Sequence, residues 1–296
     1  TESGQAWKEA IEEQSNGEIL VKYFTQSQLG GERDIMEGVQ NGTIDLTLVS
    51  TGVASNFIPE MNVMNLPFLF LNREHAEEIE LGPIGDEIVS FVDKYEGFKG
   101  LAIGGAGWRY PMAVDTPIRE VEDFQGLKWR NMEVPMHLDT YRAMGAKPVP
   151  VAFTEVYMAL KMGTIDGQEN APSIAYPMGF HEVCDYYTTL PVLLNGDVYV
   201  MNEDKWNSLS DEHQQIIMDT AKVAVKALNQ TFIDEDEKAL QAMQDESDIN
   251  VYRIPESEMG SFIEATQEVW DKYLAEFPER LRELALEIKE AGEKYQ

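Results

Sequence analysis

The sequence has little cysteine, little histidine and few basic residues, and each shortage excludes a class of protein. The single cysteine, Cys184, can form neither an intrachain disulfide nor a thiolate zinc site. No two of the four histidines stand at metal-ligand spacing on one helix, so we expect no metal site. With 23 basic against 53 acidic residues, the net charge of −30 would repel nucleic acid and anionic lipid.

Long apolar runs are also absent. No run approaches the roughly 20 residues that span a bilayer, so we do not expect the chain to be embedded in a membrane. No signal segment opens the chain, so if the protein is exported we expect its leader to have been removed. Because 43% of the 296 residues are apolar, the chain can still bury a sizeable core, as one large or two medium domains.

Motifs of common enzyme classes are missing as well. There is no Gly-x-Ser-x-Gly nucleophile elbow and no phosphate-binding loop that ends in Lys-Ser or Lys-Thr. Residues 104–107, Gly-Gly-Ala-Gly, lack the dinucleotide-binding pattern, and we interpret them as a flexible crossing between two lobes. We therefore assign no catalytic residue and no cofactor.

Apolar spacing predicts helices that alternate with short strands. Helices are predicted over 5–15, 32–40, 84–92 and 136–144, and strands over 19–24, 46–49, 100–103, 127–130 and 149–152. This alternation predicts an α/β protein with parallel sheets covered on both faces. The last third is mostly helical, and its first helix is predicted over 211–227 after Ser210, a good N-cap.

The tetrapeptide Gly-Thr-Ile-Asp occurs twice, at 42–45 and 163–166, each time after a predicted helix and before a predicted strand. In both copies the glycine can adopt the left-handed conformation that ends a helix. The repeat favours two similar α/β lobes, whose ligand would bind beyond the carboxyl ends of the strands. The candidates to face a shared cleft are Ser50 and Thr51 in one lobe and Glu169 and Asn170 in the other.

Arginine is the remaining candidate for chemistry. The middle third, 101–200, has a net charge of only −5, against −12 and −13 for the other thirds. A guanidinium matches a carboxylate with two parallel hydrogen bonds, which makes Arg109 and Arg130 candidates to bind a small anion; pairing with surface acids is the alternative. If Arg130 faces a cleft, strand alternation places Trp129 in the core. Phe153 could pack on a ligand or, equally, act as a hydrophobic staple before a helix.

Several motifs together resemble the solute-binding proteins of TRAP (tripartite ATP-independent periplasmic) transporters. They are Gly-Leu-Lys-Trp-Arg at 126–130, Tyr-Arg-Ala-Met-Gly-Ala-Lys-Pro-Val-Pro at 141–150, Phe-Thr-Glu-Val-Tyr-Met-Ala-Leu at 153–160 and Gly-Thr-Ile-Asp-Gly-Gln-Glu-Asn at 163–170. Gln-Leu-Gly-Gly-Glu-Arg at 28–33 and Leu-Pro-Phe-Leu-Phe at 66–70 are similar to the N-terminal part of the family. The resemblance covers about residues 4–240.

The resemblance implies a two-lobe periplasmic binding protein fold, with each lobe a mostly parallel sheet flanked by helices, joined by crossing strands and a long helix. We expect lobe I to contain 1–108 and 196–235, and lobe II to contain 109–195 and 236–296, with the ligand cleft between them. It also implies that Arg130 clamps a ligand carboxylate and that Arg109 is a second anion contact. Asn170 and Phe153 match two further contact positions of the family.

The implied function is that of a monomeric periplasmic receptor, which is not an enzyme and delivers an organic acid to the membrane subunits of a TRAP transporter. A sugar acid such as a uronate is the first expectation, and a C4-dicarboxylate or other carboxylate the second. Family members begin with a strand and loop ahead of the first helix, whereas this sequence starts at that helix, so we name no contact from that loop. The alternatives are a lyase-like enzyme on the same scaffold, with Glu169 or His137 as base, and a ligand-sensing module.

Overall fold

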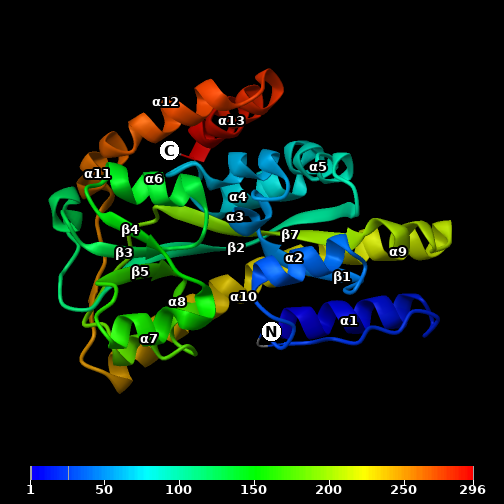
Figure 1. The fold of residues 1–296 in the computed structure, drawn as a ribbon, viewed down its shortest axis with the longest axis horizontal. Helices are drawn as coiled ribbons and strands as arrows, with labels where there is room; N and C mark the ends of the chain where they lie inside the picture. Colours follow the sequence, from blue (N-terminus) through cyan, green and yellow to red (C-terminus); the bar gives the residue numbers. More distant parts are fainter. Residues whose placement is uncertain (1, 26, 296) are drawn as a thin grey trace.

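The computed structural model describes residues 2–25 and 27–295 and shows a mixed α/β fold of two lobes (Figure 1). Within these residues the strands follow the order β1-β7-β2-β5-β3-β4, and β6 pairs with both β2 and β8. The strands are β1 (Leu46–Ser50), β2 (Phe98–Ala113), β3 (Lys128–Asn131), β4 (Lys147–Pro150), β5 (Gly167–Asn170), β6 (Tyr186–Thr188), β7 (Leu193–Asn202) and β8 (Asn250–Tyr252).

The sheets are mixed, so the prediction of parallel sheets is only partly right. Strand β3 runs parallel to β4 and β5, as expected for the second lobe. In the first lobe, however, β7 is antiparallel to both β1 and β2. The connectivity explains this difference, because β2 carries the chain out of the first lobe and β7 brings it back. Two neighbouring strands that leave and return must run in opposite directions.

Strand β2 is the crossing between the lobes. It pairs with β7 from Phe98 to Arg109 and with β5 from Tyr110 to Ala113. The register shifts between Gly104 and Gly107, where Gly104 and Gly105 have φ of +131° and +84°. Residues 104–107 thus lie in the crossing as predicted and form a bulge inside a hydrogen-bonded strand, whereas their flexibility stays a prediction. Bulges of this kind bend a strand and increase its twist.

The Gly-Thr-Ile-Asp repeat has the same backbone geometry in both copies. Gly42 and Gly163 have φ of +77° and +67°. Gly42 N–H donates to the carbonyl three residues earlier at 3.1 Å, and Gly163 N–H does the same at 3.0 Å. The next two N–H groups also share one acceptor in each copy, the carbonyl of Gly38 or of Ala159. The predicted helix–glycine–strand unit is thus confirmed in both lobes.

The helices cover both sides of the strands. They are α1 (Glu2–Gln14), α2 (Glu32–Gln40), α3 (Thr51–Ala54), α4 (Arg73–Leu81), α5 (Pro83–Ser90), α6 (Pro135–Ala143), α7 (Val156–Lys161), α8 (Pro172–Ala175), α9 (Glu203–Asn207), α10 (Asp211–Glu246), α11 (Gly260–Ala265), α12 (Gln267–Glu276) and α13 (Glu279–Ala291). Ser210 caps α10 as predicted, with its hydroxyl accepting from His213 N–H. None of the described helices combines the length and the hydropathy needed to cross a membrane.

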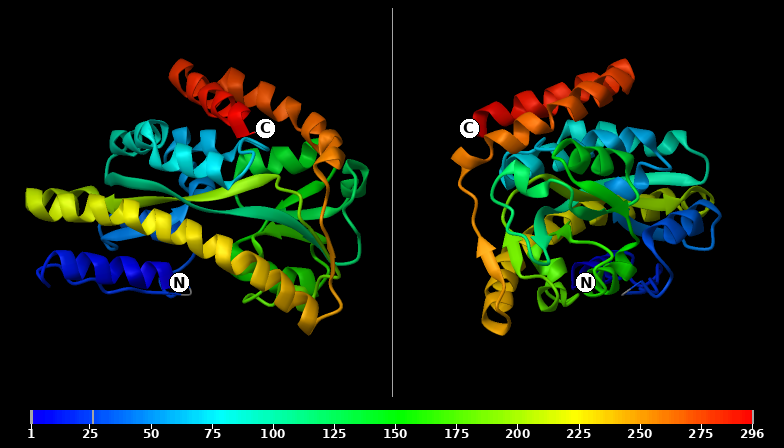
Figure 2. Two further views of the ribbon diagram at one scale, coloured as in Figure 1. Left: turned by 180° about the vertical axis from the view of Figure 1, so that it is seen from behind. Right: turned by 60° about the vertical axis from the view of Figure 1, so that its left-hand side comes forward.

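Helix α10 joins the lobes, and the two C-terminal helices lie on the opposite side of the sheet (Figure 2). The first half of α10 packs on α1, β2 and β7 through Ile217 and Val225, whereas Leu240 and Met243 pack in a core of the second lobe. Helices α12 and α13 pack with α4 and α5 in one core. The lobe boundaries stay a prediction. Helices α12 and α13, which fall in the segment 236–296 predicted to belong to lobe II, pack against helices of the first lobe.

The strand predicted over 19–24 is wrong. These residues form no strand ladder with any described segment, and Leu20 is 79% exposed. An apolar, β-branched composition favours a strand only where a partner edge offers hydrogen bonds.

Candidate functional site

A cleft of about 440 Å³ lies between the lobes. Its walls come from the start of α2, the end of β1, strands β2, β3 and β7, the segment before α7, and α10. The lining residues are Ser27, Gly31, Glu32, Arg33, Asp34, Ser50, Val53, Asn56, Arg109, Arg130, Met132, Glu133, Val151, Ala152, Phe153, Thr154, Asn170, Ile174, Asp197 and Phe232. The size suits a small organic ligand.

Arg130 is the most informative of these residues. It lies on β3 and is only 1% exposed, and its Nε donates to the carbonyl oxygen of Val151 at 2.9 Å. Its buried Nη1 has no hydrogen-bond partner among the described residues. Desolvation lowers the pKa of Arg130 to about 10, so the guanidinium stays charged at neutral pH. A buried cation with an unused donor is costly unless an anion occupies the cleft.

Trp129, the neighbour of Arg130, confirms the predicted strand alternation. Its indole is fully buried on the other face of β3, where it stacks on Tyr141 with 5.5 Å between ring centroids. Gly167 of β5 lies against this ring, since a Cβ there would be 2.2 Å from Cζ3 of Trp129. A tightly packed core thus holds the strand that presents Arg130.

Arg109 lines the cleft as predicted, but its guanidinium is also held by Glu169. Nη2 of Arg109 donates to the Glu169 main-chain oxygen at 2.8 Å and lies 3.2 Å from Oε1 of the same residue. The pair is buried, with side chains exposed by 3% and 0%. Glu169 itself does not line the cleft, since its Oε2 accepts from Trp129 and Asn131, both at 3.1 Å. Glu169 is therefore a structural anchor for the arginine.

Asn170, Ser50 and Phe153 line the cleft, whereas Thr51 does not. Asn170 is 2% exposed, and its amide donates to Gln168 Oε1 at 2.5 Å. Phe153 faces the cleft and also packs edge-on against Phe180, while its two predicted roles, ligand contact and hydrophobic staple, stay predictions.

Thr51 is fully buried at the start of α3, with an Oγ1 that no described group bonds.

His137, the other proposed base, is also outside the cleft. Its Nε2 lies 2.9 Å from Asn65 Oδ1. Burial, followed by the charges of Arg109 and Arg130, lowers the pKa of His137 well below its usual value. Neither base proposed for a lyase therefore faces the space where a ligand would sit.

Sequence reasoning missed the acidic side of the cleft. Glu32 begins α2, and its Oε1 and Oε2 accept from the N–H and the hydroxyl of Ser50 at 2.8 and 3.0 Å. Asp197 lies on β7 directly opposite Ser50 in the β1–β7 register. Desolvation, followed by the charges of Glu32 and Glu80, raises the pKa of Asp197 well above its usual value. The sequence contains one signal for this carboxyl group, because Asp197 is the charged residue in a predominantly apolar run from 192 to 200.

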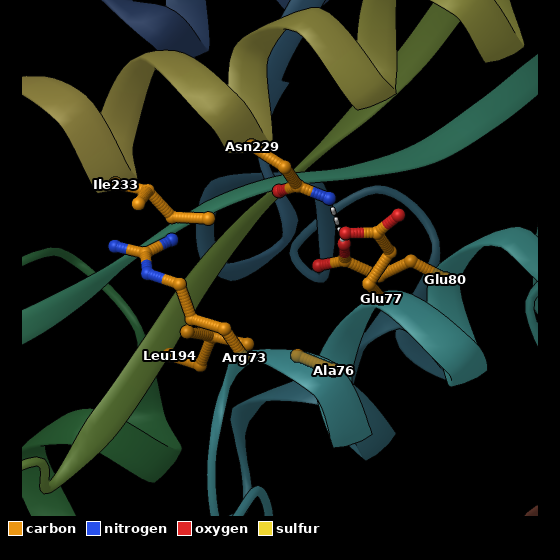
Figure 3. A pocket seen from close by; sticks show the side chains of 7 residues that line it. All are labelled: Arg73, Ala76, Glu77, Glu80, Leu194, Asn229 and Ile233. Atoms are coloured by element: carbon orange, nitrogen blue, oxygen red, sulfur yellow. Dashed lines mark hydrogen bonds between the residues drawn. The ribbon is translucent and has the colours of Figure 1, made fainter.

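A second, much smaller cavity lies between α4 and α10 (Figure 3). Its volume of about 10 Å³ suits a single water molecule. Glu80 is 3% exposed there, and its Oε2 accepts from Asn229 Nδ2 at 3.0 Å. Oε1 of Glu80 has no partner among the described residues, and burial raises the pKa of this carboxyl group to about 7. The cavity adjoins the bulge of β2, since a Cβ at Gly104 would lie 2.8 Å from Glu80 Oε2.

The fold and cleft define a class: a two-lobe binding protein with a cleft lined by two buried arginines, Arg109 and Arg130. The family model for bacterial extracellular solute-binding proteins, family 7, matches residues 2–276. The chain belongs to this family, whose members serve as periplasmic receptors of TRAP transporters and bind small acids.

Individual proteins similar to this chain are also solute-binding proteins. A solute-binding protein of Verminephrobacter eiseniae is 37% identical over 227 residues, which cover 77% of this chain and 67% of that protein. The solved TRAP solute-binding protein of Xanthobacter autotrophicus with bound β-D-galacturonate is 28% identical, with a TM-score of 0.91 over 97% of this chain and 94% of that one. A Polaromonas homologue bound to D-erythronate is 29% identical, with a TM-score of 0.91 over 97% and 92% of the two chains.

Proposed function

We propose that this protein captures a sugar acid in the periplasm, a uronate in the first instance, and delivers it to the membrane subunits of a TRAP transporter without chemical change. A C4-dicarboxylate or another carboxylate is the second candidate. The observation that carries the proposal is the buried Nη1 of Arg130, which lines the cleft without a partner among the described residues. A ligand carboxylate supplies both the missing acceptor and the missing negative charge.

The surroundings of Arg130 support this role. Glu169 holds the guanidinium of Arg109 in place through a buried ion pair, so Arg109 contributes positive charge and a rigid side chain to the cleft. Arg130 contributes the hydrogen-bond donor that has no partner among the described residues, its Nη1. Asn170 lies beside them with an amide that can bond hydroxyl or carboxylate oxygens. The two solved homologues described above contain galacturonate and erythronate, each with one carboxylate and several hydroxyl groups.

Calorimetric titration with a panel of uronates, aldonates and C4-dicarboxylates tests the proposal. For the tightest ligand, Arg130→Ala should weaken binding at least 30-fold, about 2 kcal/mol, because a buried charge-assisted contact is lost. Arg119→Ala, an exposed arginine outside the cleft, is the matched control. A change within about threefold for Arg130→Ala, below ~0.7 kcal/mol, would show that the clamp lies elsewhere.

Two further measurements address the finer parts of the proposal. Mass spectrometry of the acid after long incubation with the protein should return it unchanged, whereas a new product would establish an enzyme. Sedimentation equilibrium with and without ligand should give the mass of one chain, because we propose that the receptor acts as a monomer.

A further inference from the structure

The lining of the cleft carries both signs of charge. Arg130 and Arg109 are basic, whereas Glu32 and Asp197, which meet at Ser50 and are here called the acidic end, carry carboxyl groups. Along β7, the residue opposite Arg109 is Leu193, four positions before Asp197. At about 3.3 Å per residue, Asp197 therefore lies roughly 13 Å along the sheet from the position opposite Arg109. One small ligand between them would therefore meet a cationic group at one end and carboxyl groups at the other.

The acidic end is built by the fold. The Glu32 carboxylate accepts two hydrogen bonds from Ser50, which fix its position on the first lobe. Asp197 stands opposite the same serine in the sheet, so both carboxyl groups converge on one residue. Each carboxylate oxygen can accept more than one hydrogen bond, which leaves Glu32 free capacity towards the cleft.

We propose that Glu32 and Asp197 form a subsite for the hydroxyl groups of a ligand with a single carboxylate, and that they exclude ligands with a second carboxylate. This inference rests on the proposed function, since it assumes that Arg130 binds the carboxylate of the ligand. It narrows the ligand class from organic acids in general to polyhydroxy monocarboxylates.

The physical reason is the difference between a hydroxyl donor and an anion at the acidic end. A hydroxyl group donates to Glu32 without adding charge. A carboxylate in the same place has no proton to donate and lies against like charge, which disfavours its binding. Sites built to hydrogen-bond a hydroxyl discriminate strongly against analogues that lack it, because their own polar groups are left unpaired.

Asp197 contributes by the same logic. Burial and the charges of Glu32 and Glu80 raise the pKa of Asp197, and the same surroundings disfavour the second carboxylate of a ligand at this end. No described residue donates a hydrogen bond to this group, so the ligand is the partner that its position in the cleft leaves open.

Matched pairs of sugar acids test the inference on the full protein. D-Gluconate and D-glucarate are both open-chain acids that differ only at the end distal to the shared carboxylate, hydroxymethyl in one and carboxylate in the other, as do D-galactonate and galactarate. We expect calorimetry at pH 7.5 to give at least tenfold tighter binding of the aldonate in at least one pair. Equal or tighter binding of the aldarate in both pairs would overturn the inference.

Two variants identify the residues responsible. Glu32→Gln and Asp197→Asn keep the side-chain shapes but remove the carboxyl groups, and each should lower the aldonate-to-aldarate preference at least threefold. Glu13→Gln, which removes an exposed carboxylate from α1 outside the cleft lining, should leave the preference unchanged. An unchanged preference in both cleft variants, with urea unfolding showing that they fold, would also overturn the inference.

These outcomes separate this inference from the proposed function. If dicarboxylates bind best and Arg130→Ala abolishes their binding, the receptor function stands and the hydroxyl subsite is wrong. If no carboxylate binds and Arg130→Ala changes nothing, the proposed function itself is wrong.

Discussion

The buried carboxyl group of Glu80 predicts that the ligand-free protein loses stability as the pH rises. Burial raises the pKa of Glu80 from 4.5 to about 7 in the folded protein. Between these values the folded protein holds a proton that the unfolded chain has released, so the free energy of unfolding falls as the pH increases. Each tenfold change in an acid dissociation constant is worth about 1.4 kcal/mol, so the full effect above pH 7 is roughly 3 kcal/mol.

Glu80→Gln removes this titration while keeping the shape of the side chain. The glutamine oxygen can still accept from Asn229, and its amide replaces the carboxyl oxygen that has no partner among the described residues. From pH 5 to pH 8, the unfolding free energy of the wild type should therefore fall relative to that of the variant by about 2.5 kcal/mol.

Urea unfolding, followed by tryptophan fluorescence at several pH values without ligand, measures this difference. Glu74→Gln, which removes an exposed carboxylate from α4 outside the cavity lining, is the matched control and should follow the wild type. If the wild type and Glu80→Gln run parallel from pH 5 to 8, Glu80 is ionised in the folded protein and the reasoning fails. Asp197 changes stability in the same direction in all three proteins, and because the charge of Glu80 also raises the pKa of Asp197, Glu80→Gln removes part of that shift too, which widens the difference from the wild type.

Two substitutions test the scaffold that presents the arginines. Glu169→Gln should cost about 3 kcal/mol in urea unfolding, because it leaves the buried guanidinium of Arg109 without its counter-charge; a loss below about 1 kcal/mol would mean that another group neutralises Arg109. Gly167→Ala should lower stability by about 1–3 kcal/mol, because the new Cβ would overlap the ring of Trp129, whereas Gly260→Ala, which meets open space, should change it little. Equal effects in a thermal melt would contradict the packing argument.

The sequence predicted part of the cleft through local patterns. Strand alternation predicted that Trp129 is core if Arg130 faces a cleft, and in the structure Arg130 lines the cleft while Trp129 is fully buried. After the second Gly-Thr-Ile-Asp motif, Glu169 and Asn170 were both predicted to face the cleft, although successive residues of a strand point to opposite faces. Asn170 lines the cleft there, whereas its neighbour Glu169 turns away to hold Arg109.

Other features depend on tertiary contacts that no local pattern contains. The direction of β7 relative to β2 follows from the chain returning between lobes, so alternating helices and strands predicted the parallel strands β3, β4 and β5 but not this antiparallel pair. Glu32 enters the cleft because Ser50, eighteen positions later, bonds its carboxylate. Only the pairing of β1 with β7 then brings Asp197 beside that serine. The acidic end is therefore a product of three separate segments.

This acidic end sharpens the question of how an anion enters a protein with a net charge of −30. Exposed Asp34 and Glu133 also line the cleft, so the repulsive field extends to its entrance. Raising ionic strength from 0.01 to 0.15 M shortens the screening length from about 30 to about 8 Å, which weakens repulsion at a distance more than contact with the buried Arg130. Stopped-flow fluorescence should therefore show faster association of a sugar acid at higher salt, with little change in dissociation. Slower association would mean that the arginines dominate the field at the entrance, and that the acidic residues shape selectivity without opposing capture.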